Sequence, residues 1–308
     1  MKKKISIVVP VYNEEKNILP LIASIDKIMM QLPYIYEIVF IDDGSNDNTT
    51  KIIQEIAGNN KYIFYISFSR NFGKQSAIKA GVDYCKGDAV VFLDGDMQHP
   101  PHLINEMVQK WEEGYDIIYA KRLQNKTAAW WKRIVGGIFY TSIKKISDVP
   151  LEKGITDFSL INIRVASIIS QLNERDLFFV GLIKWLGFKQ YAIPFDAHKR
   201  LTGESKFKFK QLLQLALRGV TSFSTKPLYL AIYLGFFFSG ISILYLPYAL
   251  YSYIAGYAIS GWTSIIMTIA FLGGLQLLIL GVLGVYIGKI LMQVKRRPNY
   301  IVDKTNIL

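Results

Sequence analysis

The 308-residue sequence has a single cysteine, Cys85, which excludes a disulfide framework and any zinc site built from cysteines. Only 19% of the residues are charged, whereas 51% are hydrophobic, and this balance excludes a disordered or fibrous protein. One stretch has no charge at all: Asp, Glu, Lys, Arg and His are absent from Pro227 to Gly288, over 62 residues. A run of this length is typical of a membrane protein and very unusual for a soluble core.

The uncharged stretch has room for two membrane-spanning helices, because one span takes about 20 apolar residues. We expect them near residues 228–251 and 264–290, with a kink at Pro247 in the first. Lys and Arg are frequent on both flanks of the stretch, so the positive-inside rule places both flanks in the cytoplasm. We therefore expect a cytoplasmic domain over residues 1–226, two spans within 227–290, and a cytoplasmic tail over 291–308.

The net charge of +12 is unevenly distributed along the chain. Residues 1–120 hold 12 basic and 16 acidic residues, whereas residues 121–226 hold 19 basic and 7 acidic ones. The basic surplus thus lies next to the apolar stretch, which favours a membrane and phosphate groups as partners over nucleic acid.

Short apolar runs alternate with segments of helical periodicity in the first part of the chain. The pattern predicts strands at residues 5–9, 37–41, 62–68 and 89–93, and helices at 17–30, 47–57 and 75–85. Strands that alternate with helices predict an α/β domain with a mainly parallel sheet and helices on both faces.

Polar residues follow each of the four expected strands, at the edge where sheets of this kind bind ligands. They are Pro10, Tyr12, Asn13 and Glu14, then Asp42 and Asp43, then Arg70, Asn71, Gly73 and Lys74, then Asp94, Asp96 and Gln98. Four such strand ends in succession predict a binding site rather than four unrelated loops.

Asp94 and Asp96 follow an apolar strand directly, and two carboxylates so close together repel each other. A divalent cation removes this repulsion, and oxygen ligands suit Mg²⁺ or Mn²⁺, which commonly bridge carboxylates and a diphosphate. The alternative is a solvated turn. We interpret His99 and His102, on either side of two prolines, as turn residues rather than as metal ligands.

Two common nucleotide-binding motifs are missing. The segment 72–76 hints at a phosphate loop, but a Walker A motif requires glycine where the chain has Phe68. No GxGxxG follows the first strand, which disfavours a dinucleotide-binding Rossmann site.

Four ordered segments resemble glycosyltransferase family 2, and within it the polyprenyl-phosphate glycosyltransferases of the bactoprenol glucosyltransferase and dolichol-phosphate mannose synthase kind. They are VVPVYNEE at 8–15, IDDGS at 41–45, SRNFGK at 69–74 and LDGDMQHP at 93–100. GITDF at 154–158, HKR at 198–200, GESKF at 203–207 and SFSTKP at 222–227 are also similar to that family. The resemblance implies the GT-A fold, a Rossmann-like α/β architecture, followed by two membrane helices.

The resemblance also implies roles for the matching residues. The nucleotide sugar would be bound by Pro10, Tyr12, Asn13, Glu14, Asp42, Asp43, Lys74, Asp94 and Gly95. Asp94, Asp96 and Gln98 would hold Mg²⁺ or Mn²⁺, and Asp157 would join Asp94 and Asp96 as a catalytic residue near the reacting sugar. Phosphate groups would be bound by Arg122, Arg133, Arg200, Ser205 and Lys206.

The implied reaction transfers a sugar to undecaprenyl phosphate at the bacterial plasma membrane, with inversion at the anomeric carbon. The first choice of donor is UDP-glucose. The product would serve modification of a cell-surface glycan such as O-antigen. GDP-mannose, UDP-N-acetylhexosamine and UDP-aminoarabinose stay open as donors, as does a non-catalytic membrane protein that binds nucleotide sugars. The QxxRW motif of processive synthases is absent, which argues against polymer synthesis.

Two further segments suggest contact with the membrane surface. Residues 128–147 and 205–225 combine aromatic and basic residues, which predicts amphipathic interfacial segments. The alternatives are a helix on the domain core for the first and a solvated basic face for the second. We expect a homo-oligomer, with a tetramer as the candidate, and residues 298–308 as a loose tail or an arm on a neighbouring subunit.

Overall fold

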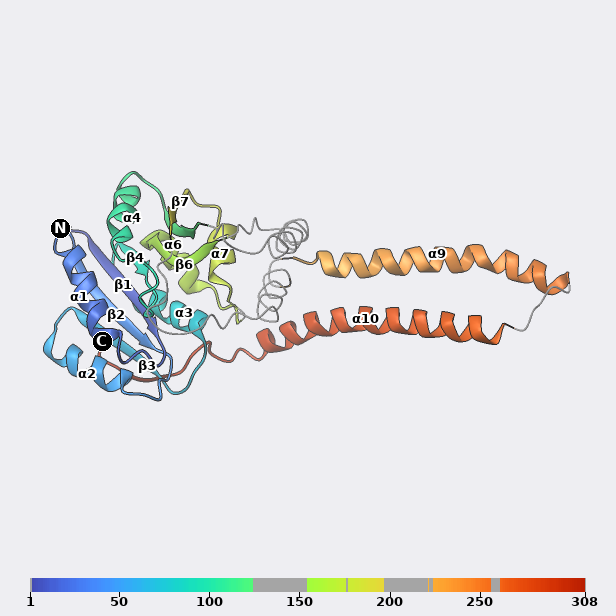
Figure 1. Cartoon of the computed structure of the whole chain (residues 1–308), viewed down its shortest axis with the longest axis horizontal. Coiled ribbons are helices and arrows are strands. Elements are labelled where there is room, and N and C mark those ends of the chain that lie inside the picture. The colour runs from blue at the N-terminus through green and yellow to red at the C-terminus, as the bar shows by residue number, and fades with distance from the viewer. Residues whose placement is uncertain are drawn as a thin grey trace.

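The computed structural model describes residues 2–123, 154–175, 177–196, 221, 224–255 and 261–307. An α/β domain lies at one end, and two long helices extend side by side away from it (Figure 1). The expected interfacial segment 128–147, and most of 205–225, lie outside the described residues.

The domain is built on one eight-stranded sheet with the order β7-β5-β6-β4-β1-β2-β3-β8. The strands are β1 Lys4–Val11, β2 Ile35–Asp42, β3 Ile63–Phe68, β4 Ala89–Phe92, β5 Ile117–Arg122, β6 Ile155–Asn162, β7 Gln190–Phe195 and β8 Val302–Thr305. The helices of the domain are α1 Ile18–Met29, α2 Thr49–Asn59, α3 Lys74–Tyr84, α4 Leu103–Glu112, α6 Ile163–Gln171 and α7 Phe179–Trp185.

The central strands are parallel, as the sequence predicts: β1 pairs with β2 and β4, and β2 pairs with β3. Alternate residues of β1 are buried on opposite faces, so that Ile7 and Val9 join one core cluster with α1 while Val8 joins the other with α3. Burial on both faces explains why these strands read as continuous apolar runs.

The other half of the sheet is mixed in direction. β6 is antiparallel to both β4 and β5, and β5 is parallel to β7. The start of β6 therefore lies at the same edge as the ends of β4 and β5, which brings residues from beyond position 150 to the edge where the four predicted strand ends meet.

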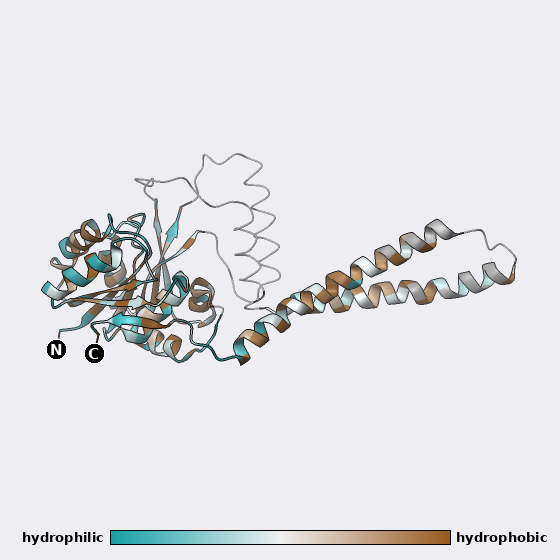
Figure 2. Cartoon of the chain, turned by 90° about the horizontal axis from the view of Figure 1, so that it is seen from below, coloured by the Kyte–Doolittle hydropathy of each residue, from teal (hydrophilic) through white to brown (hydrophobic). Residues whose placement is uncertain are grey.

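Two long helices follow the domain, α9 Lys226–Ile254 and α10 Trp262–Val294. Each contains a stretch long and apolar enough to cross a membrane, at Lys226–Tyr245 and Met267–Val294. Almost none of the side chains in these stretches is buried, unlike those of a helix in a soluble core. Brown, apolar residues run along both helices in Figure 2.

After α10 the chain returns to the domain. β8 pairs antiparallel with β3 at one end of the sheet, and the C-terminus lies on the domain near α2 and β3 (Figure 1). Residues 298–307 are thus not a loose tail, because β8 extends the sheet next to β3; an arm on a neighbouring subunit stays a prediction.

Candidate active site

The carboxyl ends of β1, β2 and β4, together with the start of α3, surround a cavity of about 350 Å³. Most of the residues predicted to bind a nucleotide sugar line this cavity, and so does the predicted metal ligand Asp96. The predicted nucleotide-sugar residues in its wall are Pro10, Tyr12, Glu14, Asp43, Lys74, Asp94 and Gly95. The predicted strand-end site is therefore a real cavity.

Gly95 lets the two carboxylates approach the end of β1. A Cβ atom on this residue would lie 2.8 Å from Val11 Cγ1 and 3.3 Å from the Pro10 carbonyl oxygen. Any side chain here would push the Asp94–Asp96 turn away from the cavity wall.

Lys74 links two acidic residues across the site. Its ammonium lies 2.7 Å from Asp94 Oδ1 and 2.7 Å from Asp157 Oδ2. Burial alone would lower the pKa of Lys74, but the charges of Asp157 and Asp94 and hydrogen bonds to both outweigh it, so the pKa lies above its ordinary value. The lysine is therefore a permanent cation, and it brings Asp157 from β6 to the cavity edge.

Asp96 is held in a tight turn. Gln98 donates from its backbone N–H to Asp96 Oδ1 over 3.1 Å and from its side-chain amide to Asp96 Oδ2. Met97 between them has φ of 57°, a left-handed conformation that is uncommon outside glycine. Gln98 does not line the cavity, and its amide is positioned to orient Asp96.

His99 lies beside the carboxylates rather than in an open turn, which corrects its interpretation as a turn residue alone. The ring is buried between Phe158 and Phe195, and its Nδ1 lies 3.3 Å from Asp94 Oδ2 without making a hydrogen bond. Burial lowers the pKa of His99, although Asp94 opposes this, so the neutral ring is favoured.

The donor set fits a divalent cation. Asp94, Asp96 and His99 each present one atom, and these atoms lie within 4.8 Å of one another. The orphaned Nδ1 of His99 is a buried polar atom aimed at the same place, and buried polar groups normally have a partner. Carboxylate oxygens with one imidazole nitrogen suit Mn²⁺ at least as well as Mg²⁺.

Asp43 fixes the loop that follows β3. Its carboxylate accepts hydrogen bonds from the backbone N–H of Phe72 over 2.6 Å and of Gly73 over 2.9 Å. Burial nevertheless raises the pKa of Asp43, partly offset by these two bonds. Gly44 has φ of 70°, and an added Cβ would lie 2.5 Å from the Arg70 carbonyl carbon, so the two loops touch where only glycine fits.

Two predicted nucleotide-binding residues hold loops together and do not line the cavity. Asp42 is buried and accepts hydrogen bonds from Ser45, Thr50 and Ser67. Asn13 joins the loops after β1 and β2, because its N–H donates to Ser45 Oγ over 2.9 Å and its Oδ1 accepts from Asn46 N–H over 2.8 Å.

Glu14 adds a further acidic group to the cavity. Burial raises the pKa of Glu14, and the nearby charges of Asp96, Asp47 and Asp94 raise it further, while a hydrogen bond from Asn17 lowers it. The carboxylates on this side of the cavity thus repel one another, and a bound cation would relieve that repulsion.

Comparison with known proteins identifies the family of the chain. Residues 6–166 match the family described as glycosyl transferase family 2. An uncharacterised glycosyltransferase of Bacillus subtilis (strain 168) is 42% identical, covering 97% of this chain and 93% of that protein. The chain belongs to glycosyltransferase family 2.

Other relatives of this family 2 glycosyltransferase carry more specific names. A bactoprenol glucosyl transferase derived from the SfII prophage of Shigella flexneri is 41% identical, covering 98% of each chain. Among solved structures, mannosyl-3-phosphoglycerate synthase from Rubrobacter xylanophilus is 14% identical with a TM-score of 0.46, over 70% of this chain and 71% of that one.

The predicted phosphate-binding residues of the glycosyltransferase are only partly visible. Arg122 is exposed at the end of β5, at the same sheet edge as the cavity but outside its lining. Arg133, Arg200, Ser205 and Lys206 lie outside the described residues. In the described part of the chain, the predicted site residues that lie together are therefore those lining the strand-end cavity, with Asp157 beside them.

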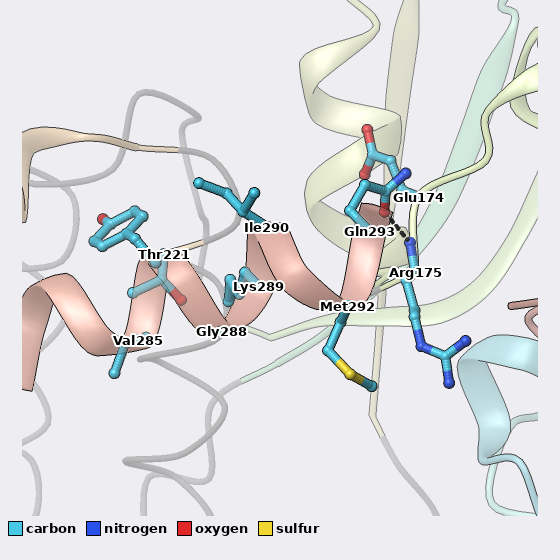
Figure 3. Close-up of a pocket in the computed structure, with 10 residues that line it drawn as sticks. Glu174, Arg175, Thr221, Val285, Gly288, Lys289, Ile290, Met292 and Gln293 are labelled. Atoms are coloured by element: carbon cyan, nitrogen blue, oxygen red, sulfur yellow. Dashed lines mark hydrogen bonds between the residues drawn. The ribbon is translucent and has the colours of Figure 1, made fainter. Parts of the chain in front are cut away.

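A second cavity, of about 710 Å³, lies where α10 meets the loop between α6 and α7 (Figure 3). Glu174 and Arg175 from the loop and Val285 to Gln293 from α10 contribute to its wall. Among the described residues, none of those predicted for the site lines this second cavity.

Proposed function

We propose that this glycosyltransferase moves a sugar from a nucleotide diphosphate to the phosphate of a polyprenyl lipid. The observation that carries the proposal is the cavity at the strand ends, where Lys74 joins the acidic turn at Asp94 to Asp157. The names of full-length relatives at about 41% identity support a bactoprenol acceptor.

The two apolar helices support an acceptor that resides in a bilayer. They follow the catalytic domain directly, and the chain after them returns to that domain, so the sheet lies next to the membrane surface if both helices span it. Basic residues near both helix ends favour the cytoplasmic side of a bacterial plasma membrane.

The acceptor does not require a strong general base. A phosphate monoester has its second pKa at about 6, so near neutral pH the lipid phosphate is already a nucleophile. The demand on the protein is to bring two phosphate groups together, and this requires positive charge. Lys74 supplies a fixed charge beside Asp94, and Arg122 supplies another at the same edge.

Asp94, Asp96 and His99 would hold the divalent cation, with Gln98 orienting Asp96. When bound, the cation would stabilise the charge on the leaving diphosphate. Asp157, held in place by its ion pair with Lys74, is positioned to accept a hydrogen bond from a sugar hydroxyl. Direct attack by the acceptor phosphate would invert the anomeric carbon.

We propose UDP-glucose as the donor, with undecaprenyl phosphate as the acceptor and a glycan of the cell surface as the destination. The glucosyl transferase names of the relatives support glucose. A homo-oligomer is proposed as well.

The test uses the full-length protein in detergent with undecaprenyl phosphate and Mn²⁺ or Mg²⁺. A panel of radiolabelled UDP- and GDP-sugars is offered, and the label that enters the organic phase is counted. We expect transfer from UDP-glucose, lost on chelation of the metal and in Asp96→Ala.

The matched control is Lys304→Ala, an exposed residue on β8 away from the cavity, which should transfer at the wild-type rate. Transfer from another sugar nucleotide alone would replace the donor and keep the class. Nucleotide binding without transfer from any donor would remove the proposed acceptor.

A further inference from the structure

The segment that leaves α10 is fastened to the catalytic domain at several points. Gln293 accepts a hydrogen bond from Arg175 N–H over 3.1 Å (Figure 3), and its side-chain amide donates to the Asn173 carbonyl over 2.7 Å. Further along, Arg175 donates to the Arg297 carbonyl over 3.1 Å, and Asn299 donates to the Glu174 carbonyl over 3.0 Å. The end of the membrane helix is thus held against the loop between α6 and α7.

Tyr300, the next residue, lies flat on the end of β3. Its ring stacks on Phe68 with centroids 5.1 Å apart and an interplanar angle of 12°. The phenol donates to Asp83 Oδ2 over 2.8 Å, and burial together with this bond raises the pKa of Tyr300. Ser69 N–H donates to the Ile301 carbonyl over 3.0 Å, which adds a backbone link at the same place.

Phe68 connects Tyr300 to the wall of the cavity, because it contacts Phe72 as well. Phe72 packs edge-on against Phe68, with centroids 5.8 Å apart and an interplanar angle of 89°. The N–H of Phe72 is one of the two that bind Asp43, and its neighbours Asn71 and Gly73 line the cavity. We call residues 69–74 the donor loop; this loop carries Lys74 at its end.

We propose that Tyr300 is a positioning residue for the donor loop, so that the segment following the membrane helices sets the affinity of the donor site. The inference rests on the proposed function, because it concerns the nucleotide pocket of that reaction. Without the stacked ring, Phe68 and Phe72 lose their outer support, and the loop must be ordered when the nucleotide binds. Ordering a loop on binding lowers affinity, whereas a pre-organised loop does not incur that cost.

The test measures UDP binding to the full-length protein in detergent with Mn²⁺, by calorimetry, beside KM and kcat for the donor. We expect Tyr300→Ala to raise both Kd for UDP and donor KM by about 10-fold, the scale of one lost aromatic pair, with kcat within about 2-fold. Tyr300→Phe keeps the stacking and loses only the bond to Asp83, so it should restore most of the affinity. Lys304→Ala, on the same segment and exposed, should bind UDP like the wild type.

The outcomes separate the two proposals. Unchanged Kd and KM in Tyr300→Ala would overturn the role of Tyr300 and leave the proposed function standing. A fall in kcat as large as the rise in KM, with no recovery in Tyr300→Phe, would also overturn the role of Tyr300. That pattern indicates a general structural defect, which affects KM and kcat together. Wild-type protein that binds neither UDP nor GDP would overturn the proposed function and this inference together. If the alanine variant does not purify, Tyr300→Leu retains apolar cover without stacking and should give the same rise in Kd.

Discussion

Lys74 at the start of α3 and Asp157 near the start of β6 form an ion pair of 2.7 Å across the edge of the sheet. The same ammonium lies 2.7 Å from Asp94, so one side chain joins a predicted metal ligand to the predicted residue nearest the sugar. At the cavity, a charged side chain thus adds a link between the end of β4 and the start of β6, beyond the pairing of these two strands.

Replacing Lys74 with methionine should move metal affinity and turnover in opposite directions. The ammonium competes with a cation for Asp94, so its loss should tighten Mn²⁺ binding, while the unsupported Asp157 should lower kcat by about 100-fold. Titration of Mn²⁺ by electron paramagnetic resonance and a transfer assay measure the two effects. Lys74→Arg keeps the charge, so it should bind Mn²⁺ more weakly than Lys74→Met does. Equal Mn²⁺ affinity in the arginine and methionine variants would contradict the competition.

Asp157→Asn should abolish transfer while leaving nucleotide binding intact. The asparagine keeps the size of the side chain but loses the charge that pairs with Lys74 and the strong acceptor for a sugar hydroxyl. UDP binding by calorimetry and label transfer to lipid are the two readouts. Transfer at the wild-type rate would remove Asp157 from the catalytic residues.

His99→Phe should weaken Mn²⁺ binding by about 10-fold or more, the scale seen when a ligand or its supporting group is removed. Phenylalanine fills the space between Phe158 and Phe195, so we expect the domain to stay folded while the nitrogen beside Asp94 is lost. His102→Phe, at the start of α4 outside the acidic cluster, is the matched control. Equal Mn²⁺ affinity in His99→Phe and wild type would exclude a role for the ring in the cation site.

Glu14→Gln should stabilise the metal-free protein near neutral pH. Burial raises the pKa of Glu14 above 4.5, so the native state binds its proton more tightly than the unfolded chain. The contribution of Glu14 to stability therefore falls as the pH rises from about 4.5 through the raised pKa, and glutamine removes that loss. Thermal melting of both proteins at several pH values checks it: the variant should melt higher at about pH 7.5, and the difference should close towards pH 4.5. A constant difference at all pH values would contradict the assignment to Glu14 ionisation.

Gly44→Ala should destabilise the domain by about 2–4 kcal/mol, because alanine at φ of 70° is strained and its Cβ would collide with the Arg70 backbone. Gly58→Ala is the control within the same domain: it lies in α2 with open space around it, and alanine there should stabilise by about 0.5–1 kcal/mol. Denaturant unfolding of both variants measures the two effects. A neutral Gly44→Ala would mean that the loops after β2 and β3 can separate freely.

The first four strands and the three helices between them could be predicted because each strand is an apolar run that is largely buried; α4, which follows the fourth strand, was not predicted. β7 could not, since it is short, lies at the end of the sheet and contains Pro194, which only an edge strand tolerates. β8 has no readable pattern at all: its four residues are mostly exposed, and they form a strand only because β3 offers an unpaired edge.

The site, like the fold, could be predicted only where its residues are close together in the sequence. Asp94 and Asp96 stand out because they are neighbours in sequence behind an apolar strand. The burial of His99 depends on two rings from β6 and β7, and the Lys74–Asp157 pair joins distant segments, so periodicity and spacing alone indicate neither contact. The sequence signal for His99 was its place three residues after Asp96.

The position of β8 has a consequence for how the protein is made. Its residues leave the ribosome only after both apolar helices have been synthesised, so the edge of β3 stays unpaired until the chain is finished. An open edge strand is a template for association with other chains. A fragment that ends before α9 would keep that edge exposed permanently, and the nascent chain passes through the same state until β8 has been synthesised.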